Sequence, residues 1–168
     1  MITLVIGGTR SGKSEVAERV AEKLGEPVTV VAPAVVDDPD FAARVAAHQA
    51  RRPASWTTIE CGPDLVRAVE AAGGTLLVDS LGSWVAAAPD MAVDSAGLIA
   101  ALRARTAPSV VVTEEVGFSV HPSTPAGRQF ADVLGALNLD IARVAAEVLL
   151  VVAGRVLPLE PKPGPTDA

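Results

Sequence analysis

A glycine-rich segment near the N-terminus has the residue types and spacing of a phosphate-binding loop. It follows the pattern G-x-x-x-x-G-K-[ST] from Gly7 to Ser14. The glycines let the backbone turn so that its N–H groups converge on phosphate oxygens, and the N-terminus of the following helix adds partial positive charge. Lys13 would contact the β- and γ-phosphates, and the Ser14 hydroxyl would bind Mg²⁺. The pattern predicts that a nucleoside triphosphate is bound by Gly7, Gly8, Thr9, Arg10, Ser11, Gly12, Lys13 and Ser14.

Acidic residues follow two apolar runs further along the chain. Asp79 ends the run 75–78, where phosphate-loop enzymes carry a second acid for the metal. Parallel strands end at the same sheet edge, so Asp79 is expected near Ser14 and Mg²⁺. The alternative is that Asp79 caps a helix over 80–88. Glu114 and Glu115 end the next run, where either could orient a hydroxyl or the metal, or both could be exposed loop acids.

A histidine among arginines forms a second candidate centre. Arg44 and His48 are spaced i, i+4 on a helix predicted over 38–51, and Arg51 and Arg52 follow. A neutral imidazole there could attack an α-phosphate while the arginines hold the leaving pyrophosphate. Spacing alone favours another interpretation, a solvated basic helix end that complements the helix dipole.

These residues need a parallel sheet to bring them together. Short apolar runs at 2–6, 28–32, 75–78 and 110–113 alternate with helical patterns, which predicts an α/β sheet covered on both faces. The runs 148–152 and 156–159 flank Gly154-Arg155 and predict a terminal antiparallel hairpin with a two-residue turn. We expect one catalytic domain over 1–160 and a flexible tail over 161–168.

Composition excludes several classes of protein. Across 168 residues, Lys and Arg total 14 against 20 Asp and Glu, so the net charge is −6, which argues against nucleic-acid binding by a basic face. The single cysteine, Cys61, excludes an internal disulfide and a cysteine-based zinc site. The chain has neither an apolar run of membrane-spanning length nor a signal-peptide pattern, so we expect a cytoplasmic protein without membrane insertion.

Six ordered motifs resemble one family nearly end to end, from about Ile2 to Leu159. They are G-G-x-R-S-G-K-S, D-x-x-x-x-x-R-[IV]-x-x-H-x-x-x-R-P, W-x-T-x-E, D-S-L-x-x-W, E-V-G and R-x-F-x-D-x-x-G-x-x-N. They begin at Gly7, Asp38, Trp56, Asp79, Glu115 and Arg128. With these motifs the chain resembles the bifunctional adenosylcobinamide kinase / adenosylcobinamide-phosphate guanylyltransferase family of cobalamin biosynthesis.

The resemblance implies a RecA-like P-loop fold, a trimer and two reactions. The enzyme would phosphorylate adenosylcobinamide with ATP or GTP. It would then transfer GMP from GTP through a guanylyl-histidine, giving adenosylcobinamide-GDP and pyrophosphate. The resemblance implies that the catalytic residues are His48, Lys13 and Asp79. It also implies that Ser14 and Asp79 bind Mg²⁺. Further nucleotide contacts would come from Arg44, Arg52, Glu60 and Glu115.

The sequence departs from the family pattern near the expected site. Glu114 stands where the family has Asn before E-V-G, and Gly82 stands where it usually has Thr. His121 occupies a position that is apolar in the family and is most simply a loop residue. Two other functions compete: a P-loop small-molecule kinase without the guanylyl step, for which His48 would be dispensable, and a nucleotide-binding module without turnover.

Overall fold

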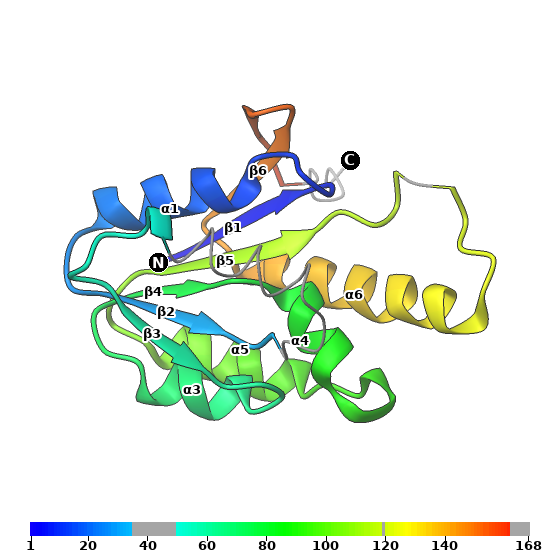
Figure 1. Ribbon diagram of the computed structural model, residues 1–168, viewed down its shortest axis with the longest axis horizontal. Helices are drawn as coiled ribbons and strands as arrows, with labels where there is room; N and C mark the ends of the chain where they lie inside the picture. Colours follow the sequence, from blue (N-terminus) through cyan, green and yellow to red (C-terminus); the bar gives the residue numbers. More distant parts are fainter. Residues whose placement is uncertain (35–49, 119, 162–168) are drawn as a thin grey trace, which may run out of the picture.

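The structure is a computed structural model, and it describes residues 1–34, 50–118 and 120–161. One seven-stranded sheet runs through this part, in the order β3-β2-β4-β5-β1-β6-β7 (Figure 1). The strands are β1 (Ile2–Gly7), β2 (Val28–Ala32), β3 (Thr57–Glu60), β4 (Thr75–Val78), β5 (Ser109–Glu114), β6 (Glu147–Val152) and β7 (Arg155–Pro158). Neighbouring strands are parallel except β6 and β7, which pair antiparallel. The predicted α/β fold class, a mostly parallel sheet with a C-terminal antiparallel hairpin, is confirmed.

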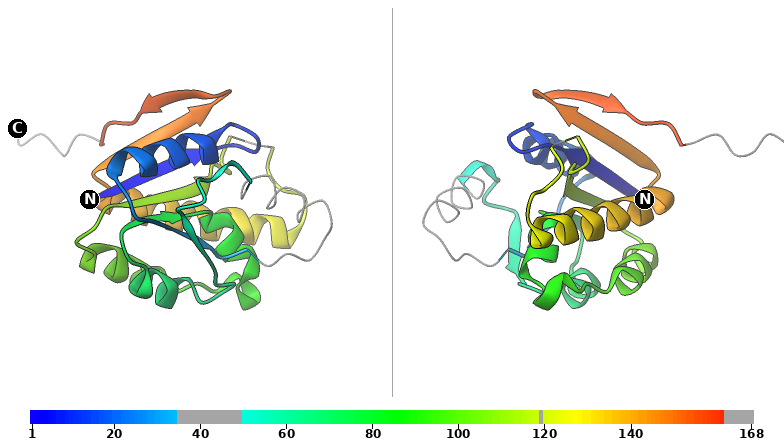
Figure 2. Two further views of the ribbon diagram at one scale, coloured as in Figure 1. Left: turned by 60° about the vertical axis from the view of Figure 1, so that its left-hand side comes forward. Right: turned by 90° about the vertical axis from the view of Figure 1, so that its right-hand side faces the viewer.

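Helices cover both faces of the sheet. Helix α1 lies on one face, and α3 to α6 lie on the other, while the β6–β7 hairpin forms one edge (Figures 1 and 2). The helices are α1 (Lys13–Leu24), α3 (Leu65–Ala71), α4 (Leu81–Ala87), α5 (Ser95–Ala104) and α6 (Pro125–Val144), with a 3₁₀ turn η1 (Pro89–Met91). No helix of the described part is long and apolar enough to cross a bilayer.

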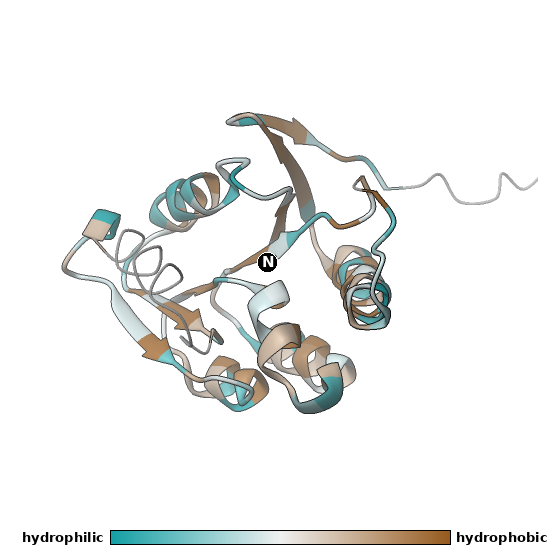
Figure 3. Cartoon of the chain, turned by 45° about the vertical axis from the view of Figure 1, so that its right-hand side comes forward, coloured by the Kyte–Doolittle hydropathy of each residue, from teal (hydrophilic) through white to brown (hydrophobic). Residues whose placement is uncertain are grey.

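Burial on both faces explains why the central strands are continuous apolar runs. Leu4 packs into the core beneath α3 to α6, whereas its neighbour Val5 packs into the core beneath α1. Leu76 and Leu77 divide between the two cores in the same way. Successive strand residues point to opposite faces, so both faces of these strand centres are apolar. The brown strands at the centre of Figure 3 show this pattern.

One local expectation is wrong, and one alternative is decided. The β6–β7 turn is formed by Ala153 and Gly154, with φ of 49° and 72°, and not by Gly154-Arg155. A two-residue hairpin turn of this type needs positive φ at both positions, so Arg155 is left to begin β7. Ser80, not Asp79, caps α4, because its hydroxyl accepts from the Ser83 N–H. The expected helix over 38–51 and the expected tail lie largely outside the described residues.

Candidate nucleotide site

The segment between β1 and α1 folds as a tight loop. The Ser11 N–H donates to the Gly8 carbonyl at 3.2 Å. Gly7 leaves no room for a side chain, because a Cβ there would lie 2.5 Å from Ser11 Oγ and 2.6 Å from the Val151 carbonyl oxygen. Gly12, with φ of 92°, caps α1 without a side-chain acceptor for the first amides. The N-terminus of α1 is thus suited to an anion.

The terminal hairpin supports this loop from the other side. The Gly154 N–H in the β6–β7 turn donates to the Ser11 carbonyl at 2.8 Å. A Cβ on Gly12 would come within 3.4 Å of Gly154 Cα, so the two backbones are closely packed. The sequence predicts the hairpin but not this contact, which joins segments far apart in the chain.

Lys13 is held across the loop by two partners. Its ammonium lies 3.4 Å from the Gly8 carbonyl oxygen and 3.5 Å from Glu114 Oε1. Only 12% of the side chain is exposed, and the Glu114 side chain is 27% exposed. The positive charge is therefore placed at the carboxyl edge of the sheet, between the loop and the end of β5.

Asp79 lies beside Ser14, as the parallel-strand argument predicts. Asp79 Oδ1 is 3.5 Å from Ser14 Oγ, and Oδ2 is 2.8 Å from Arg52 Nη2. The Arg52 side chain is 7% exposed, and its Nε lies 3.5 Å from Glu18 Oε1. Arg52, a predicted nucleotide contact, is thus brought to the same edge as the phosphate loop.

The donor set around Ser14 fits Mg²⁺ held together with phosphates. A serine hydroxyl and a carboxylate are the hard oxygen ligands that this ion accepts alongside nucleotide oxygens. Among the described residues, no group of three or more His, Cys, Asp and Glu side chains could hold a metal by itself. The arrangement therefore suits an ion that arrives with the triphosphate.

Glu114 occupies a position that sequence analysis left unassigned. Besides its ion pair with Lys13, its carboxylate accepts from the Ser80 hydroxyl at 3.0 Å and from the Gly82 N–H at 3.0 Å. Glu114 therefore links the phosphate-loop lysine to the N-terminus of α4. Sequence alone could not separate it from Glu115, because both acids follow the same apolar run.

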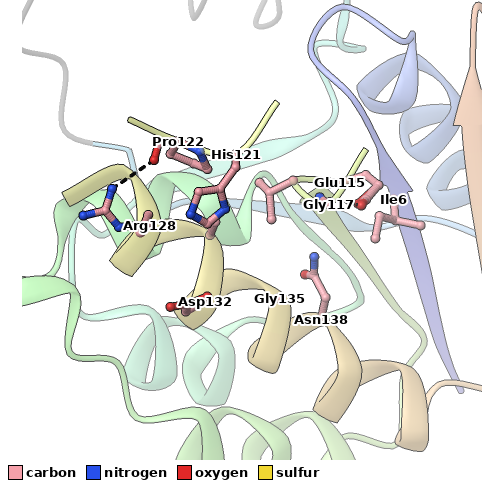
Figure 4. A pocket seen from close by; sticks show the side chains of 11 residues that line it. Ile6, Glu115, Gly117, His121, Pro122, Arg128, Asp132, Gly135 and Asn138 are labelled. Atoms are coloured by element: carbon pink, nitrogen blue, oxygen red, sulfur yellow. Dashed lines mark hydrogen bonds between the residues drawn. The ribbon is translucent and has the colours of Figure 1, made fainter. Parts of the chain in front are cut away.

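Glu115 faces a different part of the site. Its carboxylate accepts from the Gly117 N–H at 2.6 Å. It lines a pocket of about 510 Å³ between the end of β5 and helix α6 (Figure 4). The other lining residues are Ile6, Val116, Gly117, His121, Pro122, Arg128, Ala131, Asp132, Gly135 and Asn138.

The remaining expected site residues divide between the sheet edge, the loop and the part of the chain that is not described. Glu60 ends the edge strand β3, and β2 separates that strand from β4. Thr9 and Arg10 lie in the loop with exposed side chains. Arg44 and His48 lie outside the described residues.

Comparisons with known proteins point to one family. Residues 3–159 match the model of the family described as cobinamide kinase / cobinamide phosphate guanyltransferase. The bifunctional adenosylcobalamin biosynthesis protein CobP of Pseudomonas aeruginosa is 34% identical, covering 97% of this chain and 99% of that protein. The bifunctional protein CobU of Salmonella typhimurium is 35% identical, covering 92% of this chain and 97% of that protein. Among solved structures, the RadB recombinase matches with a TM-score of 0.47 and 14% identity, over 89% of this chain and 73% of that one.

Proposed function

Because the chain belongs to the cobinamide kinase / cobinamide phosphate guanyltransferase family, we propose that its phosphate loop serves both half-reactions and that His48 carries the guanylyl group between them. Family membership makes the chain an enzyme of cobalamin biosynthesis with kinase and guanylyltransferase activity. The observation that carries the proposal is the convergence of Lys13, Ser14, Asp79 and Arg52 at one sheet edge.

In the kinase step the described residues position and neutralise the triphosphate. The amides of the loop and of the first turn of α1 cradle the phosphates, and Lys13 balances charge on the β- and γ-phosphates. The acceptor hydroxyl oxygen attacks the γ-phosphorus, the bond to the β-phosphate oxygen breaks, and the hydroxyl proton is released. Ser14 and Asp79 would hold Mg²⁺, which supplies further neutralisation of phosphate charge.

In the guanylyl step the attacking group is the His48 imidazole. Its nitrogen attacks the α-phosphorus of GTP and pyrophosphate leaves; the phosphate of the phosphorylated acceptor then attacks the same phosphorus and restores the histidine. His48 precedes Arg52 by four residues, which limits their Cα separation to about 14 Å. Arg52 pairs with Asp79 and is nearly buried, so the chain four residues after His48 is anchored at the edge of the phosphate loop. Arg52 would stabilise the departing pyrophosphate.

Separating the two half-reactions tests this division of labour. Purified enzyme is incubated with adenosylcobinamide and ATP, then with GTP, and the corrinoid products are resolved by mass spectrometry. The His48→Ala variant should form adenosylcobinamide phosphate at the normal rate and no GDP derivative. The Lys13→Ala variant should be defective in phosphorylation. A His48→Ala variant that still forms the GDP derivative would contradict the proposal.

The hairpin edge supports assembly into a homo-oligomer, which we propose is the trimer that the family resemblance implies. The side chains of Val152, Val156, Leu157 and Leu159 on β6, β7 and the following residue are 41–58% exposed. Apolar side chains grouped on an edge strand are typical of an interface. Sedimentation velocity should give the trimer mass, and Leu157→Glu should shift the protein toward monomer. A monomeric wild-type protein would contradict the proposal.

A further inference from the structure

Two sequence motifs that lie outside the phosphate loop meet in one pocket. Four positions of the R-x-F-x-D-x-x-G-x-x-N motif line it: Arg128, Asp132, Gly135 and Asn138. Their spacing of four, three and three residues places them on one face of α6. The E-V-G motif, Glu115 to Gly117, forms the opposing wall (Figure 4). The local pattern of each motif thus contributes to a single concave surface.

This pocket is joined directly to the phosphate loop. The Glu115 N–H donates to the Gly7 carbonyl at 3.1 Å, so the wall begins where the loop begins. Asn138 Nδ2 donates to the Glu114 carbonyl oxygen at 2.9 Å, and the Glu114 side chain pairs with Lys13. Glu115 in the pocket wall therefore directly follows Glu114, which contacts the loop lysine. A molecule in the pocket would lie beside the phosphates.

The lining disfavours a second polyphosphate and favours an uncharged donor of hydrogen bonds. Glu115 and Asp132 bring two carboxylates to the pocket. Among the described lining residues, Arg128 is the one arginine or lysine, and its Nη1 donates to the Pro122 and Ser123 carbonyl oxygens at 3.1 Å each, so a single guanidinium faces two carboxylates. Carboxylates accept from N–H and O–H groups and repel phosphates. Carboxamides and hydroxyls are therefore the groups that suit this pocket.

Two exposed large apolar side chains adjoin lining residues in the sequence. Phe118 follows Gly117 and is 82% exposed, and Val120 precedes His121 and is 92% exposed. Exposed side chains of this kind would pack on a flat apolar ligand that extends beyond the pocket. A pocket of about 510 Å³ also suits part of a large ligand better than the whole of one.

We propose that this pocket is the acceptor subsite, which binds the carboxamide-bearing edge of the corrinoid and directs its hydroxyl toward Lys13. The inference rests on the proposed function, because that function supplies a corrinoid acceptor. Asp132 and Glu115 accept from the carboxamide N–H groups, and Phe118 and Val120 cover the edge of the ring. Glu115 thus faces the acceptor and not the nucleotide.

A larger side chain at Gly135 should fill the pocket without disturbing helix α6. A Cβ there would meet nothing within 4 Å, so Gly135→Leu adds volume without a clash at the helix. Ala136→Leu is the matched control, because Ala136 is exposed and is absent from the pocket lining. Equilibrium dialysis measures the binding of adenosylcobinamide and of GTP to each protein. We expect Gly135→Leu to weaken corrinoid binding at least about tenfold, while GTP binding stays within about twofold and Ala136→Leu resembles wild type.

The outcomes separate this inference from the proposed function. If Gly135→Leu binds adenosylcobinamide as tightly as wild type, the pocket is not the acceptor subsite, although the proposed function stands. If Gly135→Leu loses GTP and retains the corrinoid, the pocket takes the nucleoside and the inference is overturned. If wild type neither binds nor phosphorylates adenosylcobinamide, both fail. As a second test, Asp132→Asn should raise KM for the corrinoid and leave KM for GTP unchanged; a change in KM for GTP alone would count against the assignment.

Discussion

The Glu114 carboxylate lies in the space that a side chain at residue 82 would need. The Gly82 N–H donates to Glu114 Oε2 at 3.0 Å, and a Cβ on Gly82 would overlap that same oxygen. Glu114 and Gly82 are also two of the positions at which the sequence departs from the pattern that the family resemblance implies, which has Asn and Thr there. Together they form a matched pair, in which the missing side chain admits the longer acid and its ion pair with Lys13.

The matched pair predicts coupled effects on the kinase step. Gly82→Thr alone should displace Glu114 and lower kcat, whereas Gly82→Thr combined with Glu114→Asn should recover much of the loss. A double-mutant cycle on kcat and KM for ATP should give a coupling of about 1 kcal/mol or more. Strictly additive effects of the two substitutions would mean that the residues act independently.

Lys13 should be indispensable for phosphoryl transfer. Its ammonium lies next to the loop carbonyl of Gly8 and to Glu114, where γ-phosphate charge must be neutralised. Lys13→Ala should lower kcat for adenosylcobinamide phosphorylation by about 100-fold or more. The matched control is Lys23→Ala, in the last turn of the same helix, which should leave kcat unchanged. Equal effects of the two substitutions on kcat would show that Lys13 has no specific role in phosphoryl transfer.

Replacing Arg105 should lower the free energy of unfolding without a direct effect on catalysis. Its guanidinium donates to three main-chain carbonyls, at Val69, Ala72 and Gly74, and to the Ser109 hydroxyl. Burial lowers the pKa of the Arg105 guanidinium. The hydrogen bonds of this guanidinium satisfy main-chain carbonyls at the end of α3. Arg105→Ala should lower the free energy of unfolding by about 2–3 kcal/mol, because those carbonyls lose their donor.

The control for Arg105 is an exposed arginine. Arg143, whose side chain is 63% exposed, pairs with Asp140 on the surface of α6. Arg143→Ala should change the free energy of unfolding by no more than about 0.5 kcal/mol. Urea denaturation of both variants measures the difference, and equal losses would show that the carbonyl contacts of Arg105 contribute little.

Cys61 should react slowly in the folded enzyme. Burial, with a smaller contribution from the Asp64 charge, raises the pKa of its thiol from 9.0 to about 11. The thiolate is the reactive form, so alkylation by iodoacetamide at pH 8.5 should be about 10- to 100-fold slower in the folded protein than in urea. The same shift predicts that stability falls as the pH rises from 9.0 through about 11, since the unfolded thiol ionises first. Equal alkylation rates in the two states would contradict the raised pKa.

Features set by local patterns were predictable from the sequence. The start of α1 after Gly12 and the end of β4 before Asp79 follow from the loop motif and from an apolar run bounded by polar residues. The proximity of Asp79 to Ser14 also followed, because parallel strands share one carboxyl edge. The predicted hairpin turn lay one residue too far along the chain, because an Ala-Gly pair is a weaker turn signal than Gly next to a polar residue.

Contacts between distant segments were not predictable in the same way. Nothing local to Glu114 indicates that its partner is Lys13, or that Gly82 leaves room for it. The docking of Gly154 on Ser11 likewise depends on the strand order, which places β6 beside β1. The helical spacing from Arg128 to Asn138 indicates one face, but only the fold shows that the E-V-G segment lies opposite.

Covalent guanylylation of His48 can be measured directly on the protein. Enzyme is incubated without acceptor in GTP labelled at the α-phosphate, then denatured, and the protein-bound label is tested for acid lability and alkali stability. His121→Ala is the matched control, because His121 is the other histidine of the chain and lines the pocket beside the phosphate loop. We expect label on wild type and on His121→Ala, and none on His48→Ala. Label that persists on His48→Ala, or wild type that binds GTP and carries no label, would contradict the account.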